Sequence, residues 1–296
     1  MALSREVVAY PLNRRLLIPT STGRGAAAAI ATSMSCKPAA VGAHHLAWLV
    51  TRCSGTAMIP GARQALRLPE AVDAVLSDVA EVVGGIDSVA VLSRRQARRG
   101  AHLVLAYQAS TPIAFCKIAD SSNAPTFDTE QRCLRALSLL SPGPVVVPQL
   151  LAAGLAHGLQ YTAMSALPPR PHRPARGDIS AVVAWIQRGL ANAIPRTGPA
   201  HWRAIHGDFA PWNLRRLWFG DRTLFDFEDA RYGPPLADTV FWNVATATLR
   251  GRAMESTIDE ESREFWRLFL EDRLSTQSKP ELDDRLLATL LNASVS

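Results

Sequence analysis

Apolar residues along the chain occur in two patterns that predict different elements. Short apolar runs typical of β-strands occupy 88–92, 102–107 and 112–118. Apolar positions spaced three or four residues apart, typical of one helix face, cover 179–190, 235–249, 258–274 and 280–292. Because the strands come first and the helices later, the pattern predicts an α+β chain with a mixed lobe followed by a mostly helical lobe.

The two lobes are expected to be joined near 160–167, an apolar strand that leads to Pro168 and Pro169. The Pro- and Arg-rich segment 168–176 is expected to be an irregular linker. Asp178 is expected to cap the helix that follows it.

Residues 1–80 have a different composition from the rest of the chain. No Asp or Glu occurs between Glu6 and Glu70, and Ser, Thr and Ala are plentiful. This composition allows a transit peptide or an anion-binding surface. However, 15–19 has the pattern of a strand, 26–34 that of a short helix and 46–50 that of part of another. We therefore expect 1–80 to be a folded extension packed on a smaller lobe at 81–167, with a helical lobe at 168–296.

The overall composition is typical of a cytoplasmic enzyme. At 296 residues, 48% hydrophobic and 20% charged, the chain can bury a sizeable core. Its four Cys form no C-x-x-C pair, which favours reduced thiols, and no apolar run approaches the roughly 18 residues of a membrane span. The net charge of +6 is basic, but no nucleic-acid-binding motif accompanies it, so no nucleic-acid partner is expected.

The most informative motif reads His-Gly-Asp-Phe-Ala-Pro-Trp-Asn at 206–213, and Leu-Phe-Asp-Phe-Glu follows at 224–228. A hydroxyl that attacks a terminal phosphate must lose a proton, and Asp208 is the candidate base. Hard cations that hold a triphosphate take oxygen ligands, which Asn213 and Asp226 can provide.

The spacing of these residues supports one shared site. Pro211 lies between Asp208 and Asn213 and predicts a tight loop. The apolar runs 214–219 and 223–227, divided by Gly-Asp, predict a hairpin whose second strand brings Asp226 beside that loop.

In these motifs the chain resembles the aminoglycoside phosphotransferase and choline kinase superfamily. The resemblance implies a bilobal protein-kinase-like fold with a small β-rich N-lobe and a mostly helical C-lobe. It also implies Asp208 as the catalytic base, Asn213 and Asp226 as magnesium ligands, and His206 as a residue that braces the loop.

Two further acids match the family pattern. Glu228 matches a frequent acid two positions after the metal-binding Asp, with a less defined role. Asp238 matches a buried acid at the start of the next helix, which implies a structural contact to the backbone of the catalytic loop.

Lys117, at the end of the strand 112–118, is the candidate for nucleotide binding. Only three of the 32 basic residues are Lys, so a Lys kept at this position suggests a compact charge for phosphate oxygens. The alternative is a strand-end Lys whose head extends into solvent.

Glu130 is the expected partner of Lys117. It follows Phe127, where a helix is expected to begin, and Leu134, Leu137 and Leu140 recur at helical intervals behind it. The alternative is that Glu130 only favours the positive end of the helix dipole.

The connection 93–100 between the first two strands contains four Arg but only one Gly. A G-x-G-x-x-G loop that would cradle phosphates is absent. The arginines could contact phosphates, although a solvated turn is the favoured interpretation.

The sequence therefore predicts an ATP- and Mg²⁺-dependent phosphotransferase that acts on a hydroxyl of a small molecule. Aminoglycoside-like, choline-like and sugar-like acceptors stay open, as do ATP against GTP and the oligomeric state. A catalytically weak or inactive nucleotide-binding scaffold is one alternative. The other is an interaction protein whose basic N-terminal segment binds an acidic polymer or membrane surface.

Overall fold

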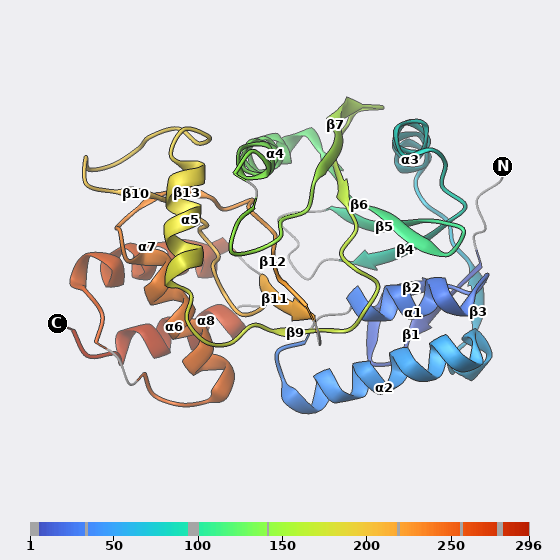
Figure 1. The fold of residues 1–296 in the computed structure, drawn as a ribbon, viewed down its shortest axis with the longest axis horizontal. Coiled ribbons are helices and arrows are strands. Elements are labelled where there is room, and N and C mark those ends of the chain that lie inside the picture. Colours follow the sequence, from blue (N-terminus) through green and yellow to red (C-terminus); the bar gives the residue numbers. More distant parts are fainter. Residues whose placement is uncertain are drawn as a thin grey trace.

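A computed structural model describes residues 6–32, 35–93, 101–140, 142–217, 220–254, 257–276 and 281–295. The chain forms a β-rich lobe and a mostly helical lobe, which lie side by side in Figure 1. The expected α+β, bilobal architecture is confirmed.

One antiparallel sheet of eight strands organises the β-rich lobe, in the order β3-β1-β2-β4-β5-β6-β8-β7. Its five central and far-edge strands are β4 (Ser88–Ser93), β5 (His102–Gln108), β6 (Thr111–Asp120), β7 (Leu150–Ala156) and β8 (Leu159–Ser165). β4, β5 and β6 confirm the three strands predicted from the apolar runs. The connection between β4 and β5, at 94–100, lies outside the described residues.

The N-terminal extension continues this sheet at the edge formed by β4. Its strands are β1 (Glu6–Tyr10), β2 (Asn13–Pro19) and β3 (Arg63–Ala65), and β2 pairs with β4. Its helices are α1 (Gly23–Thr32), α2 (Pro38–Ser54) and α3 (Glu70–Val83), with the 3-10 turn η1 (Thr56–Met58) after α2. Residue 80, where the extension was expected to end, lies inside α3. The strands before and after this position belong to one sheet.

The two faces of the sheet are covered by different helices. α3 packs its valines on one face, in a cluster with Val104, Cys116 and Ile118. α1 packs small residues on the opposite face, in a cluster with Leu105 and Tyr107, and Phe115 borders that cluster. Because side chains alternate along a strand, Phe115 and Lys117 share the face that carries α1.

The helical lobe contains α5 (Ser180–Leu190), α6 (Ala237–Arg250), α7 (Glu260–Thr276) and α8 (Glu281–Leu291). All four predicted helices are confirmed within two residues of their expected ends. Two small sheets accompany them, one of β9 (His172–Pro174), β11 (Leu214–Leu217) and β12 (Arg222–Leu224), the other of β10 (Arg203–Ile205) and β13 (Arg231–Gly233).

Three local expectations were wrong. The segment 168–176 contains β9, which pairs with β11 instead of being wholly irregular. The helix α4 (Ala124–Ser138) begins three residues before Phe127. β12 ends at Leu224, so Asp226 lies in the loop after the strand.

None of the helices in the described part of the chain combines the length and the apolarity that a bilayer crossing requires.

Candidate active site

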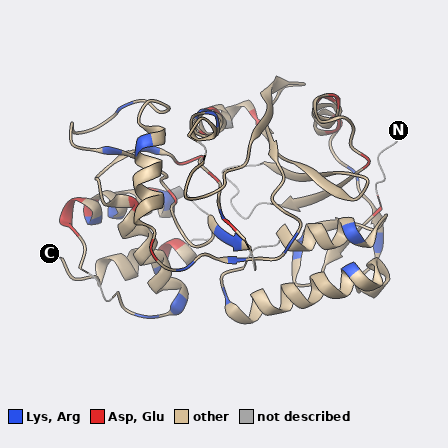
Figure 2. Ribbon diagram, viewed as in Figure 1, with Lys and Arg blue, Asp and Glu red and all other residues tan. Residues whose placement is uncertain are grey.

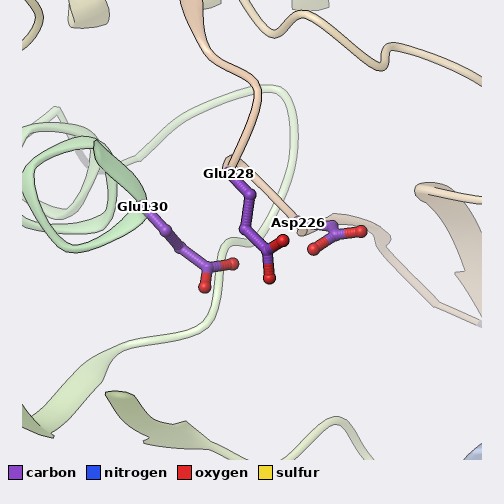
Figure 3. Close-up of side chains that lie close together, drawn as sticks. All are labelled: Glu130, Asp226 and Glu228. Carbon is purple, nitrogen blue, oxygen red and sulfur yellow. The ribbon is translucent and has the colours of Figure 1, made fainter. Parts of the chain in front are cut away.

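Lys117 lies at the centre of a cluster of three carboxylates. Its Nζ is 2.7 Å from Glu130 Oε1, 2.6 Å from Asp226 Oδ1 and 2.7 Å from Glu228 Oε1. Figure 3 shows the three acids converging from α4 and from the segment after β12. The alternative of a Lys that extends into solvent is wrong, because Lys117 is only 4% exposed.

The position of Glu130 follows from the way α4 is attached to the sheet. Gln131, the next residue, donates from Nε2 to Thr162 Oγ1 on β8 at 2.9 Å. Thr162 is the cross-strand neighbour of Lys117, so this bond turns the adjacent Glu130 toward the lysine. The alternative role at the helix start is wrong, because α4 begins at Ala124 and its first turn carries no acid.

The cluster has more negative than positive charge when its acids are ionised. Burial raises the pKa of Glu130 to about 7, Lys117 opposes that shift, and Glu228 and Asp226 add to it. One ligand oxygen from each acid lies within 4.8 Å of the others. Such closely spaced oxygens fit a hard divalent cation, which would compensate the excess negative charge.

The catalytic-loop candidate Asp208 is held by its neighbours through one carboxylate oxygen. Trp212 Nε1 donates to Asp208 Oδ2 at 3.0 Å, and Asn213 Nδ2 donates to the same oxygen at 2.8 Å. Asn213 Nδ2 also donates to the Asp208 carbonyl at 2.8 Å. In the described part of the chain, Asp208 Oδ1 is buried with no hydrogen-bond partner.

The pKa of Asp208 is raised to about 7, chiefly by burial. The positive charge of Arg273 lowers the pKa of Asp208, and the negative charges of Asp229 and Asp226 raise it. A carboxylate whose pKa lies near neutral pH, and which has one oxygen without a hydrogen bond, can accept a proton from a hydroxyl.

The backbone before Asp208 is fixed by Asp238, which lies in the first turn of α6. Asp238 Oδ2 accepts from the His206 amide at 2.8 Å, and Oδ1 accepts from the Gly207 amide at 3.4 Å. Asp238 is fully buried, so these bonds are shielded from competing water.

His206 braces the loop from its other side. Burial lowers the pKa of His206 to about 4, so its imidazole is neutral. Its Nδ1 is 3.3 Å from the Asp208 amide and its Nε2 is 3.2 Å from the Phe225 carbonyl. These partners assign the proton to Nε2, which donates to Phe225, while Nδ1 accepts from Asp208.

Gly207 is required by the geometry of the same loop. Its φ is +82°, and a Cβ at this position would lie 1.9 Å from the Asp229 carbonyl oxygen. The loop that carries Asp208 therefore passes closer to the backbone at Asp229 than any residue with a side chain allows.

Asp226 connects the lysine cluster to the catalytic loop. The amide of Phe225 donates to the Asn213 carbonyl at 3.3 Å, which places Asp226 directly after a contact with the loop. Asp226 has a φ of +71°, a conformation that Asp tolerates better than most residues. Its side chain is 32% exposed, the most accessible of the four groups in the cluster.

Trp212 and Arg215 were not singled out in the sequence. Arg215 is fully buried, and its guanidinium donates to the carbonyls of Ser35, His172 and Pro211. A signal was available, because adjacent arginines in a strand face opposite sides and one of Arg215 and Arg216 had to point inward.

The model of the phosphotransferase enzyme family matches residues 174–265, which is less than half of the chain. The matched segment contains Asp208, Asn213 and Asp226, and it confirms the resemblance of these motifs to phosphotransferases. No curated protein matches the chain.

Several solved structures are similar to the chain at low sequence identity. The GDP and kanamycin complex of APH(2")-IIia has a TM-score of 0.48 and 14% identity, covering 74% of this chain and 97% of the other. Macrolide 2'-phosphotransferase MphH from Brachybacterium faecium has a TM-score of 0.46 and 14% identity, covering 74% and 98%. The amicoumacin kinase hAmiN, in complex with AMP-PNP, Ca²⁺ and Ami, has a TM-score of 0.44 and 13% identity, covering 74% and 85%.

Proposed function

We propose that this protein is a small-molecule kinase that transfers the γ-phosphoryl group of ATP to a hydroxyl, with Mg²⁺. The observation that carries the proposal is the hydrogen bonding of the Asp208 carboxylate. One of its oxygens is held by Trp212 and Asn213, and the other is buried with no hydrogen-bond partner among the described residues. A substrate hydroxyl would satisfy that oxygen and lose its proton to it.

The other residues have roles that follow from their contacts. Lys117 would bind phosphate oxygens, and Glu130 would orient Lys117 from the helix behind it. Asp238 and His206 would hold the loop that carries Asp208. Glu228 would help to fix the position of Lys117 Nζ through its 2.7 Å contact. The rate would come mainly from alignment and charge stabilisation.

Asp226 and Asn213 are the proposed ligands of Mg²⁺. The side-chain N–H groups of Asn213 are directed to Asp208, so its amide oxygen is the atom left for a cation. The excess of carboxylates around Lys117 fits a divalent cation on the accessible side, where Asp226 lies. When bound, Mg²⁺ supplies positive charge that neutralises and aligns the phosphate oxygens.

A screen of nucleotide consumption would test the function. The purified protein is incubated with ATP or GTP and with cationic, neutral and anionic hydroxyl compounds, in Mg²⁺ or in EDTA. We expect turnover that requires both an acceptor and Mg²⁺, with a phosphorylated product detectable by mass spectrometry. Turnover no faster than in acceptor-free controls across the whole panel would contradict the proposal.

A kinase-like scaffold with little or no turnover is the second candidate. The observation that favours it is the position of α1, which covers the face of the sheet that carries Phe115 and borders Ala166 after β8. A nucleotide base would have to fit beside this helix. Tight binding of AMP-PNP together with Mg²⁺-dependent product formation would exclude this candidate.

A further inference from the structure

A cavity lies between the N-terminal extension and the helical lobe. It measures about 1070 Å³, and its walls come from the start of α2, from β9 and β11, and from the end of α6. Neither Lys117 nor Asp208 lines it. Pro211 from the catalytic loop does, so the cavity shares a wall with the candidate active site.

The charged residues that line this cavity are all basic. None of the described residues that line it is Asp or Glu. Its cationic side chains are Arg173, Arg176, Arg216, Arg250 and Arg252. Figure 2 shows blue positions on β9, on β11 and at the end of α6, on the side of the helical lobe that faces α2.

Several of these arginines have no acid to compensate them. Among the described residues, Arg176, Arg216, Arg250 and Arg252 form no ion pair, and all four are exposed. By contrast, the half-buried Arg267 on α7 pairs with both Glu264 and Glu271. The positive charge around the cavity is therefore concentrated and locally unbalanced.

A buried charge behind the wall increases this imbalance. Arg215 Nη1 lies 3.7 Å from Sγ of Cys36, which lines the cavity. The Arg215 guanidinium is fully buried and forms hydrogen bonds with carbonyls, but with no carboxylate in the described part of the chain. Burying an uncompensated charge is costly, and an anion nearby would offset part of that cost.

Nearby histidines are affected by the same positive charge. Burial lowers the pKa of His44, His45 and His172, and the positive charge of Arg215 lowers each of them further. His45 lines the cavity and is kept neutral in these surroundings. Its neutral form is the one expected where positive potential is already high.

We propose that this cavity is a binding site for a small polyanion with two or more phosphate or carboxylate groups. Arginine forks bind such groups in a bidentate manner, and arginines on three separate elements suit a ligand with several anionic groups. The volume is close to the upper end of typical small-molecule sites, about 300–1,000 Å³, and is too small for a folded partner. A polycationic ligand would be repelled.

The role of the ligand in the reaction rests on the proposed function, whereas its binding does not. Arg215 Nη1 donates to the Pro211 carbonyl at 3.3 Å, which links the cavity to the loop of Asp208. The ligand is therefore either an anionic acceptor or an anionic effector that acts through this loop. Both have the same recognition chemistry, and the assay below separates them.

Binding is tested by isothermal titration calorimetry with tripolyphosphate, with citrate as a carboxylate probe and maltose as an uncharged one. The buffer is freed of metal on a chelating resin and contains no soluble chelator, since EDTA is itself a polycarboxylate. Without metal, the carboxylates around Lys117 disfavour anions, so the titration reports the cavity. We expect both anions to bind, maltose not to bind, and added salt to weaken binding. The triple variant Arg216→Gln, Arg250→Gln, Arg252→Gln should bind about tenfold more weakly or worse.

The control is Arg188→Gln, which removes an arginine that is also exposed but lies on α5 and does not line the cavity. It should keep the wild-type affinity. Arg216→Gln alone is the second variant, in case the triple variant does not fold. No binding of either anion to the wild type, or equal losses in the cavity variants and in Arg188→Gln, would overturn the proposal.

Turnover assays then distinguish the two roles. With ATP and Mg²⁺, an anionic acceptor is consumed, and its KM rises in the cavity variants while kcat changes little. An effector is not consumed but changes the turnover of another acceptor, and that effect is lost in the same variants. Anion binding without any ATP turnover would contradict the proposed kinase function but would still support the proposed anion site in the cavity.

Discussion

Gly207→Ala is the change that most directly tests how the catalytic loop is held. The new Cβ would lie 1.9 Å from the Asp229 carbonyl oxygen and 2.5 Å from its carbonyl carbon, so one of the two backbones must move by about 1 Å. Overpacking of this kind costs about 1–3 kcal/mol, and the positive φ of +82° costs an L-residue about 1–2 kcal/mol more. We expect a loss of about 2–5 kcal/mol in the free energy of unfolding.

The same displacement should reduce activity, because Asp208 is the next residue. A misplacement of about 1 Å in a catalytic group can cost about 10²-fold in rate. Unfolding in guanidinium chloride, followed by Trp fluorescence, measures the stability, and ATP turnover measures the rate.

Gly158→Ala provides a matched control for the cost of the positive φ. Gly158 has a similar φ of +77°, but a Cβ there would meet nothing within 4 Å. It should lose only about 1–2 kcal/mol and keep its activity. If Gly207→Ala is no less stable than Gly158→Ala, the close approach between Gly207 and Asp229 does not exist as described.

Three further predictions follow from the contacts in the site. Burial raises the pKa of Asp208 to about 7, and a base must be ionised, so kcat/KM should fall about tenfold per pH unit below pH 7; a flat profile from pH 5 to 8 would contradict this. Lys117→Met leaves three carboxylates without their cation and should cost about 3–5 kcal/mol near neutral pH, measured by denaturation, with Mg²⁺ restoring more stability to the variant than to the wild type. Asp238→Asn replaces one of two acceptors for buried backbone amides by a donor and should cost about 1–3 kcal/mol together with a lower kcat; unchanged values of both would show that Asp238 does not hold the loop.

The parts of the fold that the sequence predicted are those with local signals. The strands β4 to β6 and the helices α5 to α8 have clear apolar periodicity, and each was expected near its observed range. Strands β10 and β13 have three residues each, too few for periodicity to be detected, and they pair across a long stretch of chain. The pairing of β2 with β4, which merges the extension into the sheet, is likewise a contact between segments distant in sequence.

The candidate site was predictable in its residues but not in its geometry. The motif spacing indicated that Asp208, Asn213 and Asp226 would lie near one another. It did not indicate that Asp226 would lie after the strand with a positive φ, because apolar periodicity does not specify the backbone conformation of a loop residue. Of the three carboxylate contacts of Lys117, only the one with Glu130 was predicted, since Glu228 had no defined partner in the sequence.

The basic cavity could not be predicted, because its arginines come from segments far apart in the chain. Arg is abundant in the whole sequence, so no single position stood out. Only folding brings 173–176, Arg216 and 250–252 together beside α2.

The most direct test of the account is the phosphoryl transfer rate of Asp208→Asn, measured with ATP, Mg²⁺ and the best acceptor of the screen. Asn has the same shape but cannot accept the proton, so we expect the rate to fall by about 10²–10⁴-fold. The affinity for AMP-PNP should stay within about twofold of the wild type, because Asp208 is not one of the three carboxylates that lie within 2.7 Å of Lys117 Nζ. A variant that transfers phosphate at the wild-type rate would show that Asp208 is not the base.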